Sequence, residues 1–446
     1  MISRRITVVG CGHVGLVTAA GFAHLGHQVC GLDISAPLVD QLNKAVNPFV
    51  EDGLQELLAE GVNGKHLSFT TDYGTAMAGA EFVFLTVDTP TTPTGGADLS
   101  NIRAATRSIR EHMPAEGSII VNKSTSPVGT GETIASIVRS GLADDGREPR
   151  IVSNPEFLRE GQAVYDFLHP DRIVIGSSSH DDAHAVAELY GDLGPLLITD
   201  LRTAELIKYV ANSYLATRIS FANEIAKLCE GLGTDVDDVL RGAGMDSRIG
   251  TRYFAAGLGY GGSCLPKDVA ALRFIGELYG VTTPVLTAVE MVNKSRPIEI
   301  IRRLRNELGD LADKHIGVWG VTFKGGTEDT RDSPALGVIS ALMNEDVRLS
   351  VYDPAAPAQV PASVAAAMVP SAIEAALGAD ALVVLTDWAE FQDVPLRDVA
   401  AAMSGNLLID GRNHLDPEAA CAAGLIYMGM GRQTRLPIAE SIAAAR

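Results

Sequence analysis

The sequence contains no apolar run long enough to cross a bilayer. A membrane-spanning helix needs about 20 consecutive apolar residues, and no segment of the 446-residue chain approaches that length. The N-terminal apolar run is also too short for the core of a signal peptide. We therefore expect a soluble protein without a membrane partner.

Cysteine is scarce, and positive charge is in deficit. The five cysteines are odd in number, scattered and without metal-ligand spacing, which favours reduced thiols in the cytoplasm and no bound metal. Because 55 Asp and Glu outnumber 36 Lys and Arg, the formal net charge of -19 argues against a nucleic acid or an anionic membrane as partner. A local basic pocket for a phosphorylated small molecule is still compatible with that charge.

The remaining composition is that of a globular protein. Apolar residues make up 46% of the chain and charged residues 20%, which is typical of folded domains and not of disordered chains. A single hydrophobic core does not grow to this length, so we expect two or three domains.

The N-terminal segment combines a short buried strand, a glycine-rich turn, a helix and a second strand. Ile6–Val9 is followed by the G-x-G-x-x-G turn Gly10–Gly15, a helical pattern from Leu16, and a strand that ends at Asp33. This order and spacing predict a dinucleotide-binding fold, with a purely structural glycine turn as the alternative.

The residues of this turn predict the cofactor. Gly10 and Gly12 allow a tight turn and the close approach of a pyrophosphate to the helix N-terminus, and Gly15 allows close packing of helix on strand. Asp33 can accept hydrogen bonds from an adenosine ribose and would repel a 2′-phosphate, and no arginine follows it. NAD is therefore favoured over NADP.

Polar residues follow three further buried strands of this domain. Strands at 81–87 and 118–121 run into the polar segments 88–91 and 122–130, which we expect near the cofactor. Glu156 and Glu160 follow the strand at 151–153; on a helical turn they would share a face and could hold a general base and a positioned water. A solvated helix start is the alternative. A strand at 170–176 is expected to close the domain.

Long helices are expected in the middle of the chain, and strands return after it. Residues 203–230 form a nearly uninterrupted helical pattern, of a length that usually crosses between domains or builds a dimer interface, and Lys208 and Asn212 share a face of it. Strands at 316–323, 347–352 and 379–386 then repeat the N-terminal pattern without a complete G-x-G-x-x-G. A sugar nucleotide suits this region better than a second dinucleotide, with Lys324, Arg331 and Arg412 as candidate contacts.

The fold class is therefore α/β, with two Rossmann-like doubly wound domains joined by a central helical domain that contains the long helix. The expected boundaries are 1–200 for the NAD-binding domain, 201–308 for the central helical domain, and 309–446 for the domain that suits a sugar nucleotide.

One thiol stands out in the central region. Cys264 ends a glycine-rich approach and is followed by Pro266, Lys267 and Asp268, where a helix is expected to begin. A cysteine attacks as a thiolate, which is favoured beside a cation or at a helix N-terminus. Taken alone, Cys264 is better interpreted as a buried thiol in a glycine-rich loop. In a protein with an NAD site, Cys264 is a candidate nucleophile, because oxidation of an aldehyde requires that a nucleophile add to it first.

Six ordered motifs resemble those of the UDP-glucose/GDP-mannose dehydrogenase family over essentially the whole chain. They are Gly10 to Gly15 with Asp33; Ser124-Thr125-x-Pro127-Val128-Gly129; Asn154-Pro155-Glu156-Phe157-Leu158-Arg159-Glu160-Gly161; Glu205-x-x-Lys208-Tyr209-x-Ala211-Asn212; Gly259-x-Gly261-Gly262-Ser263-Cys264-x-Pro266-Lys267-Asp268; and Phe323-Lys324-x-x-Thr327-x-Asp329-Thr330-Arg331-x-Ser333-Pro334.

The resemblance implies a four-electron, NAD-dependent oxidation of a nucleotide sugar through a thiohemiacetal and a thioester on Cys264. Lys208 and Asn212 would stabilise the oxyanion, and Asp268 and Glu156, with Thr125 holding a water, would serve proton transfer and hydrolysis in an order that stays open. The implied cofactor contacts are Gly10, Gly12, Val14, Gly15, Asp33, Thr89, Thr125, Glu160, Lys267 and Arg331. The implied substrate contacts are Glu156, Phe157, Leu158, Arg159, Glu160, Lys208, Asn212, Arg248, Tyr253, Gly261, Phe323, Lys324 and Arg412, with Arg248 reaching across a homodimer interface.

Departures from the family pattern are small, and other interpretations stay open. His13 stands where an aromatic residue is usual, Asp88 where Gly or Pro is common, and Ser126 where Val is common. UDP-glucose is the favoured substrate, whereas GDP-mannose and UDP-N-acetylhexosamines would use the same catalytic set. A non-catalytic nucleotide-sugar sensor and a two-electron hydroxyacid dehydrogenase are the competing functions.

Overall fold

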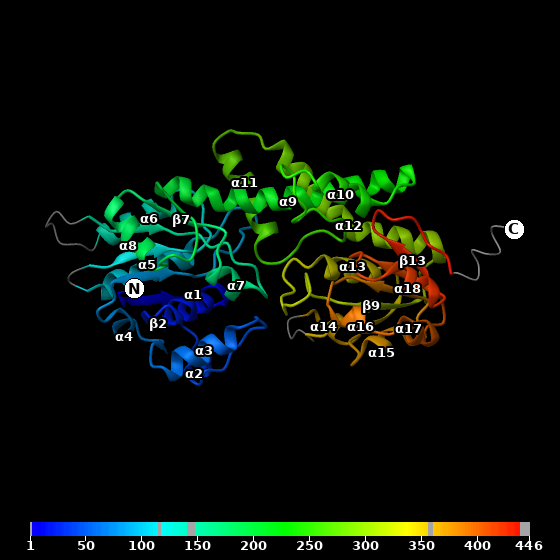
Figure 1. Cartoon of the computed structure of the whole chain (residues 1–446), viewed down its shortest axis with the longest axis horizontal. Coiled ribbons are helices and arrows are strands. Elements are labelled where there is room, and N and C mark those ends of the chain that lie inside the picture. The colour runs from blue at the N-terminus through cyan, green and yellow to red at the C-terminus, as the bar shows by residue number, and fades with distance from the viewer. Residues whose placement is uncertain (1, 115–116, 141–147, 356–359, 438–446) are drawn as a thin grey trace. The chain divides into compact units, whose positions relative to one another are not determined.

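The computed structural model describes residues 2–114, 117–140, 148–355 and 360–437. Its internal contacts divide the chain into two compact units. Unit 1 contains Met1–Ala211 and Ala270–Tyr279, and unit 2 contains Asn212–Val269 and Gly280–Arg446 (Figure 1). Within the described ranges, no helix combines the length and the apolar character needed to span a membrane.

Unit 1 is built on an eight-stranded sheet in the order β3-β2-β1-β4-β5-β6-β7-β8. All neighbouring strands are parallel except β6 and β7. The strand order reverses between β1 and β4, and ligands of open α/β sheets bind beyond the carboxyl ends of the strands at such a point. The strands are β1 (Arg5–Val9), β2 (Gln28–Leu32), β3 (Leu67–Thr70), β4 (Phe82–Leu85), β5 (Ile119–Asn122), β6 (Ile151–Ser153), β7 (Ile173–Ser177) and β8 (Leu196–Thr199).

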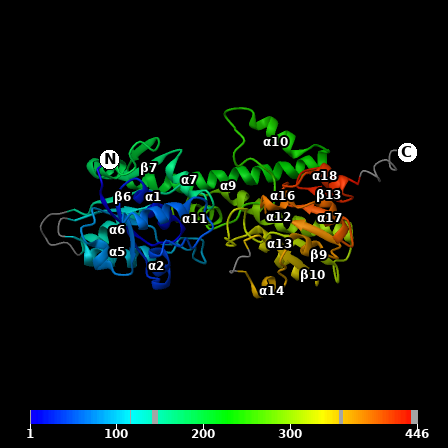
Figure 2. The same ribbon diagram turned by 60° about the horizontal axis from the view of Figure 1, so that its bottom comes forward.

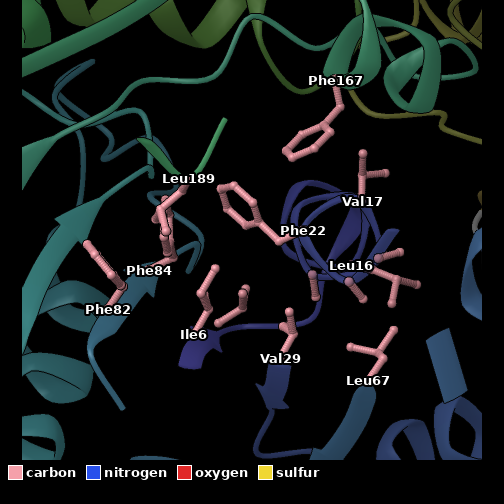
Figure 3. Packing of buried hydrophobic residues seen from close by; sticks show 14 of the residues in the cluster. Ile6, Leu16, Val17, Phe22, Val29, Leu67, Phe82, Phe84, Phe167 and Leu189 are labelled. Atoms are coloured by element: carbon pink, nitrogen blue, oxygen red, sulfur yellow. The ribbon is translucent and has the colours of Figure 1, made fainter. Parts of the chain in front are cut away.

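Apolar clusters cover both faces of this sheet. Ile6 and Val8 of β1 belong to one cluster and Val9 to another, as the two-residue period of a strand requires. Phe22 lies at the centre of the first cluster, 5.0 Å from the ring of Phe84 (Figure 3). The helices of unit 1 before the long helix are α1 (His13–His24), α2 (Ala36–Asn43), α3 (Leu54–Asn63), α4 (Tyr73–Met77), α5 (Ser100–His112), α6 (Thr130–Arg139), α7 (Ala163–Leu168) and α8 (His180–Glu188).

The long central helix is continuous, as predicted. Helix α9 (Leu201–Leu232) runs unbroken (Figures 1 and 2), and its first 11 residues belong to unit 1 and the others to unit 2. Neither glycine nor proline interrupts it before Gly231. The other central helices are α10 (Val236–Gly244), α11 (Leu265–Leu278) and α12 (Pro284–Leu308).

Unit 2 contains a second sheet of five parallel strands in the order β10-β9-β11-β12-β13. Val318 and Trp319 of β9 enter different apolar clusters, so this sheet is also covered on both faces. Its strands are β9 (His315–Trp319), β10 (Arg348–Tyr352), β11 (Ala381–Val384), β12 (Leu407–Asp410) and β13 (Ile426–Gly429). Its helices are α13 (Pro334–Met343), α14 (Ala362–Ala365), α15 (Ala372–Ala376), α16 (Glu390–Asp393), α17 (Leu396–Ala402) and α18 (Pro417–Ala422).

The predicted fold class is confirmed: two Rossmann-like domains flank a helical region in the sequence. The first domain does not close at β7, however, because α8 and β8 follow it. Strand β8 was not predicted, because it is a short edge strand without an alternating apolar and polar pattern. Its Leu196 and Leu197 are 46% and 48% exposed.

Candidate functional site

The three glycines of the first turn have three different surroundings. A Cβ on Gly15 would lie 1.8 Å from the carbonyl oxygen of Gly10, so its absence lets α1 pack on the turn. Gly10 has a φ of +95°, which favours glycine. A Cβ on Gly12 would meet nothing within 4 Å, so this side of the turn is open beside the N-terminus of α1. The residues fit a dinucleotide, whose phosphates would occupy that open side.

Asp33 is bound to the same turn. One carboxylate oxygen accepts the amide of Cys11 at 2.8 Å, and the other accepts the amide of Ser35 at 2.9 Å. The side chain is only partly buried, so it keeps acceptor capacity for a ribose hydroxyl. Val14 lies in the first turn of α1, next to the open side of the glycine turn, and is also partly exposed.

A buried ion pair forms the centre of the cluster in unit 1. The Lys208 ammonium lies 2.8 Å from Glu156 Oε1, and both side chains are 4% exposed. Glu156 Oε2 also accepts the amide of Leu158 at 2.6 Å. Burial would raise the pKa of Glu156, but the Lys208 ammonium, the Leu158 amide and the Lys123 ammonium together hold the pKa below its ordinary value. The site therefore contains a carboxylate that is ionised at neutral pH.

A second buried cation, on the residue directly after β5, faces this pair. The Lys123 ammonium donates to Asn154 Oδ1 and to the Tyr190 hydroxyl, at 3.2 Å each. Burial lowers the pKa of Lys123 to about 8, although the Glu156 carboxylate opposes that shift. Lys123 was not among the predicted site residues. The only signal for it in the sequence is a lysine immediately before the Ser124-Thr125 segment.

The segment after β6 corrects one prediction. Residues 154–159 are not helical, so Glu156 and Glu160 do not share the face of a helical turn. Pro155 follows Asn154 and disfavours a helical conformation there. The segment runs instead as a loop in which Phe157 lies between two cations, 3.7 Å from the Arg172 guanidinium and 5.4 Å from the Lys208 ammonium. Arg159 is paired with Asp166 at 2.6 Å.

A small polar pocket adjoins Lys208. Thr125 is one of its lining residues, and its carbonyl oxygen accepts the hydroxyl of buried Thr89 at 2.6 Å. Glu205, one turn before Lys208 on α9, also lines the pocket. It belongs to the same sequence motif as Lys208, but no role was predicted for it. We name this the Glu205 pocket; it is lined by Asn122, Ser124, Thr125, Ser126, Ser153, Pro155, Glu205 and Lys208.

The cluster in unit 2 centres on Asp268. One of its carboxylate oxygens accepts the Asn212 amide at 2.6 Å, and the other lies 2.6 Å from the Lys267 ammonium. Cys264 directly precedes α11, and its carbonyl accepts the Asp268 amide at 2.9 Å. The Cys264 side chain is partly exposed, and its sulfur lies 3.5 Å from Ser263 Oγ. A helix N-terminus favours an anion there.

The glycines before Cys264 serve close packing within unit 2. A Cβ on Gly259 would lie 2.4 Å from Asn293 Oδ1, and one on Gly261 would lie 2.3 Å from the carbonyl oxygen of Asp332. Gly262, at a φ of +81°, has the Phe323 ring within 2.8 Å of the same position. These glycines therefore let the segment lie directly against its neighbours.

The predicted substrate residues of the C-terminal region have distinct surroundings. Arg412 donates to the carbonyls of Leu385, Gly259 and Phe323 at 2.6–3.0 Å. Lys324 lies 5.6 Å above the Phe323 ring. Arg331, an implied cofactor contact in the same region, pairs with Asp329 at 2.6 Å. In the central region, Arg248 pairs with Asp246 with 87% of its side chain exposed, and Tyr253 has a φ of 56°.

The second Rossmann-like domain has an acidic residue at the position that corresponds to Asp33 of the first. Asp353 follows β10 as Asp33 follows β2, and it accepts the amide of Val321 at 2.7 Å. Unlike Asp33, it is 1% exposed and also accepts from Thr322, Ala355 and Trp388. It has little capacity left for a ribose, in keeping with the prediction that no second dinucleotide binds here.

Comparisons with known proteins show which family the chain is similar to. Three models of the UDP-glucose/GDP-mannose dehydrogenase family match in order: the NAD binding domain over residues 4–194, the central domain over 202–295 and the UDP binding domain over 317–417. The resemblance and the NAD prediction are thereby confirmed, and the small-molecule ligand is a nucleotide sugar. Among the described residues, no group of three or more His, Cys, Asp or Glu could hold a metal ion.

Individual relatives match over almost their full length. The chain is 39% identical to UDP-glucose 6-dehydrogenase YwqF of Bacillus subtilis, covering 97% of this chain and 99% of that one. It is 41% identical to UDP-glucose 6-dehydrogenase of Pseudomonas aeruginosa, covering 96% and 97%. The solved UDP-glucose dehydrogenase of Pyrobaculum islandicum is similar with a TM-score of 0.88 at 35% identity, covering 97% and 98%.

Proposed function

Because the chain belongs to the UDP-glucose/GDP-mannose dehydrogenase family, we propose that it is an NAD-dependent UDP-glucose 6-dehydrogenase. UDP-glucose, two NAD⁺ and one water would give UDP-glucuronate, two NADH and three protons. NAD supplies the hydride acceptor for both oxidations. The observation that carries the proposal is Cys264 at the N-terminus of α11, with Asp268 held by Asn212 one turn later.

Cys264 would act between the two oxidations. After the C6 alcohol becomes an aldehyde, the thiolate adds to its carbon and the carbonyl π electrons move to oxygen. Hydride loss from this thiohemiacetal gives a thioester. Water then attacks the thioester, the C–S bond breaks, and the thiolate is restored. Each half-reaction gives one NADH.

Lys208 and Asn212 would stabilise the oxyanion of the thiohemiacetal. They lie one turn apart on α9, and both donate hydrogen bonds. Glu156 and Asp268 would move the protons, with Thr125 holding the attacking water. The ionised state of Glu156 supports a role as acceptor, and the order in which the two carboxylates act is left open.

Residues outside the reaction centre would hold the two nucleotides. Gly10, Gly12, Val14 and Gly15 would surround the NAD pyrophosphate, with Asp33 on the adenosine ribose. Thr89, Thr125, Glu160, Lys267 and Arg331 complete the proposed cofactor contacts. The proposed sugar-nucleotide contacts are Phe157, Leu158, Arg159, Glu160, Tyr253, Gly261, Phe323, Lys324 and Arg412, with Arg248 supplied by a partner subunit.

A homodimer through α9 is part of the proposal. Tyr214, Phe221 and Leu228 are spaced seven residues apart on this helix and are 52–60% exposed, so they form an apolar stripe of the kind that pairs with another helix. Light scattering after size-exclusion chromatography should give a dimer, and Phe221→Glu should give monomers. A wild-type monomer would contradict this part of the proposal.

The reducing cytoplasm is the proposed location. All five cysteines are free thiols, and free thiols are typical of proteins that stay in a reducing compartment.

The number of NADH molecules formed per UDP-glucose tests the function. We expect two; one would indicate a two-electron dehydrogenase, and none a non-catalytic sensor. The same assay with GDP-mannose and UDP-N-acetylhexosamines tests the alternative substrates, which the relatives do not favour. A higher kcat/KM for either of these than for UDP-glucose would overturn the substrate assignment.

A further inference from the structure

Glu205 joins three segments of unit 1 through one buried carboxylate. Its Oε2 accepts the amide of Gly129 at 2.7 Å, and its Oε1 accepts the amide of Gly131 at 2.7 Å. Oε1 also receives a weaker hydrogen bond from Ser153 Oγ at 3.4 Å. The residue is 4% exposed.

The two amides depend on this carboxylate for a partner. Gly129 is the N-cap of α6, at a φ of +97°, and Gly131 lies in its first turn. The first amides of a helix have no acceptor within the helix itself. A Cβ on Gly131 would lie 3.1 Å from Leu201 Cδ2 and 3.4 Å from Glu205 Oε1, so glycine avoids a tight contact with α9 at this point. Glu205 thus caps α6 from a distant helix.

Each of the joined segments carries a residue proposed for the reaction. The segment before α6 contains Thr125, the loop after Ser153 of β6 contains Glu156, and the next turn of α9 contains Lys208. Glu205 and two of these, Thr125 and Lys208, line the Glu205 pocket. A displacement of α6 relative to α9 would therefore change the geometry of the reacting groups.

We propose that Glu205 is a positioning residue, which in its ionised form sets the place of Thr125 relative to Lys208 and Glu156. An ionised carboxylate accepts both amides at once. A protonated one carries a hydroxyl on one oxygen, which is a weaker acceptor than a carboxylate oxygen, so one of the two amide hydrogen bonds weakens. The inference rests on the proposed function, because it assigns Glu205 to the same reaction centre.

The charge state of Glu205 changes near neutral pH. Burial raises the pKa of Glu205 to about 7, although the amides of Gly131 and Gly129 lower it. The Glu132 carboxylate of α6 raises it further and is itself paired with Arg202 of α9 at 2.6 Å. Lys208 is the other charged group of the Glu205 pocket. We call the two hydrogen bonds from the Gly129 and Gly131 amides to Glu205 the Glu205 cross-link. Both bonds are therefore at full strength above pH 7, and one of them weakens as the pH falls.

The test is Glu205→Gln, followed by kcat and KM for UDP-glucose between pH 6 and pH 9. A glutamine presents an NH₂ group to one of the two amides, so kcat should fall about 10-fold to 100-fold while KM for UDP-glucose changes less than about 3-fold. Wild-type kcat should fall below pH 7, and this decline should be absent in the variant. A variant that keeps the decline, or keeps full kcat, overturns the proposal.

Glu132→Gln is the matched control. Glu132 is a half-exposed carboxylate on the first turn of α6. Its replacement removes a charge but leaves the hydrogen bonds from the Gly129 and Gly131 amides to Glu205 in place. This variant should retain the decline of kcat, shifted to slightly lower pH. Loss of the decline in the control would assign the titration to another group and overturn the proposal.

Amide hydrogen exchange tests the cross-link without substrate. The Gly129 and Gly131 amides should exchange at least 10-fold faster in Glu205→Gln than in the wild type, after correction for intrinsic rates, and should not change in Glu132→Gln. Unchanged exchange in Glu205→Gln overturns the proposal. Failure of the wild type to form NADH with UDP-glucose would instead refute the proposed function, and the exchange result would still stand.

If Glu205→Gln does not fold, Glu205→Asp replaces it. The aspartate keeps the charge but is one methylene shorter, so it cannot reach both amides. It should lower kcat and keep the decline below pH 7, whereas full activity would contradict the positioning role.

Discussion

Replacing Lys208 with Met should strongly destabilise unit 1 at neutral pH. Methionine keeps most of the apolar stem but removes the ammonium 2.8 Å from Glu156, at a site where both side chains are 4% exposed. Removing one partner of a buried ion pair typically costs about 3–5 kcal/mol. The Leu158 amide and the Lys123 ammonium remain to stabilise the carboxylate. The expected loss is therefore at the lower end, about 3 kcal/mol.

The sign of the pH dependence follows from the pKa of Glu156. In the wild type this pKa is lowered from 4.5, so the pair stabilises the fold above that value, and the contribution is lost as the pH falls through the folded pKa. Without Lys208, burial raises the folded pKa above 4.5, and protonation relieves the buried charge. The stability deficit of Lys208→Met should accordingly shrink between pH 7 and pH 5.

Urea unfolding followed by circular dichroism measures these differences. The set comprises wild type, Lys208→Met, Glu156→Gln and the double variant at pH 7 and pH 5. The double variant removes both charges and should recover most of the loss. The exposed Lys294, 78% accessible and 3.7 Å from Glu290, supplies the control, because Lys294→Met should change stability by less than about 1 kcal/mol. A loss below about 1 kcal/mol for Lys208→Met, or no recovery in the double variant, would refute the reasoning.

Three further changes test other parts of the site. Cys264→Ala should reduce UDP-glucuronate formation to background, because no thioester can form, and normal steady-state production would exclude the thiol mechanism. Gly261→Ala places a Cβ 2.3 Å from the Asp332 carbonyl oxygen and should lower the free energy of unfolding by about 1–3 kcal/mol, seen as a lower midpoint in thermal unfolding. Gly12→Ala places its Cβ where nothing lies within 4 Å, so stability should stay within about 0.5 kcal/mol while the KM for NAD rises; an unchanged KM would argue against a pyrophosphate at that side of the turn.

The NAD site could be predicted from the sequence because its parts are local. Gly10, Gly15 and Asp33 lie within one βαβ unit, in which Gly15 packs against the turn and Asp33 accepts the Cys11 amide. Their contacts with NAD stay a prediction. The same logic found the second Rossmann-like domain. It could not predict that Asp353, at the position equivalent to Asp33, already accepts hydrogen bonds from four residues, because one donor comes from Trp388, 35 residues away.

The conformations around the reacting groups were harder to predict. Two carboxylates four residues apart suggested a helical turn at Glu156 and Glu160, whereas Pro155 and a buried ion pair favour a loop. The glycine-rich segment before Cys264 was also part of a predicted site. In the structure its glycines meet other protein segments, and their role toward a sugar nucleotide stays a prediction.

The sequence by itself determined the family, the fold class, the cofactor and the identity of the chemical groups, because motif order and residue type carry that information. The tertiary structure decided which groups are charged and which are held in place. The ionised state of Glu156, the burial of Lys123 and the cross-link made by Glu205 all depend on partners 31 to 76 residues away. Burial and pairing fix a charge state in three dimensions, and neither is visible in the residue type.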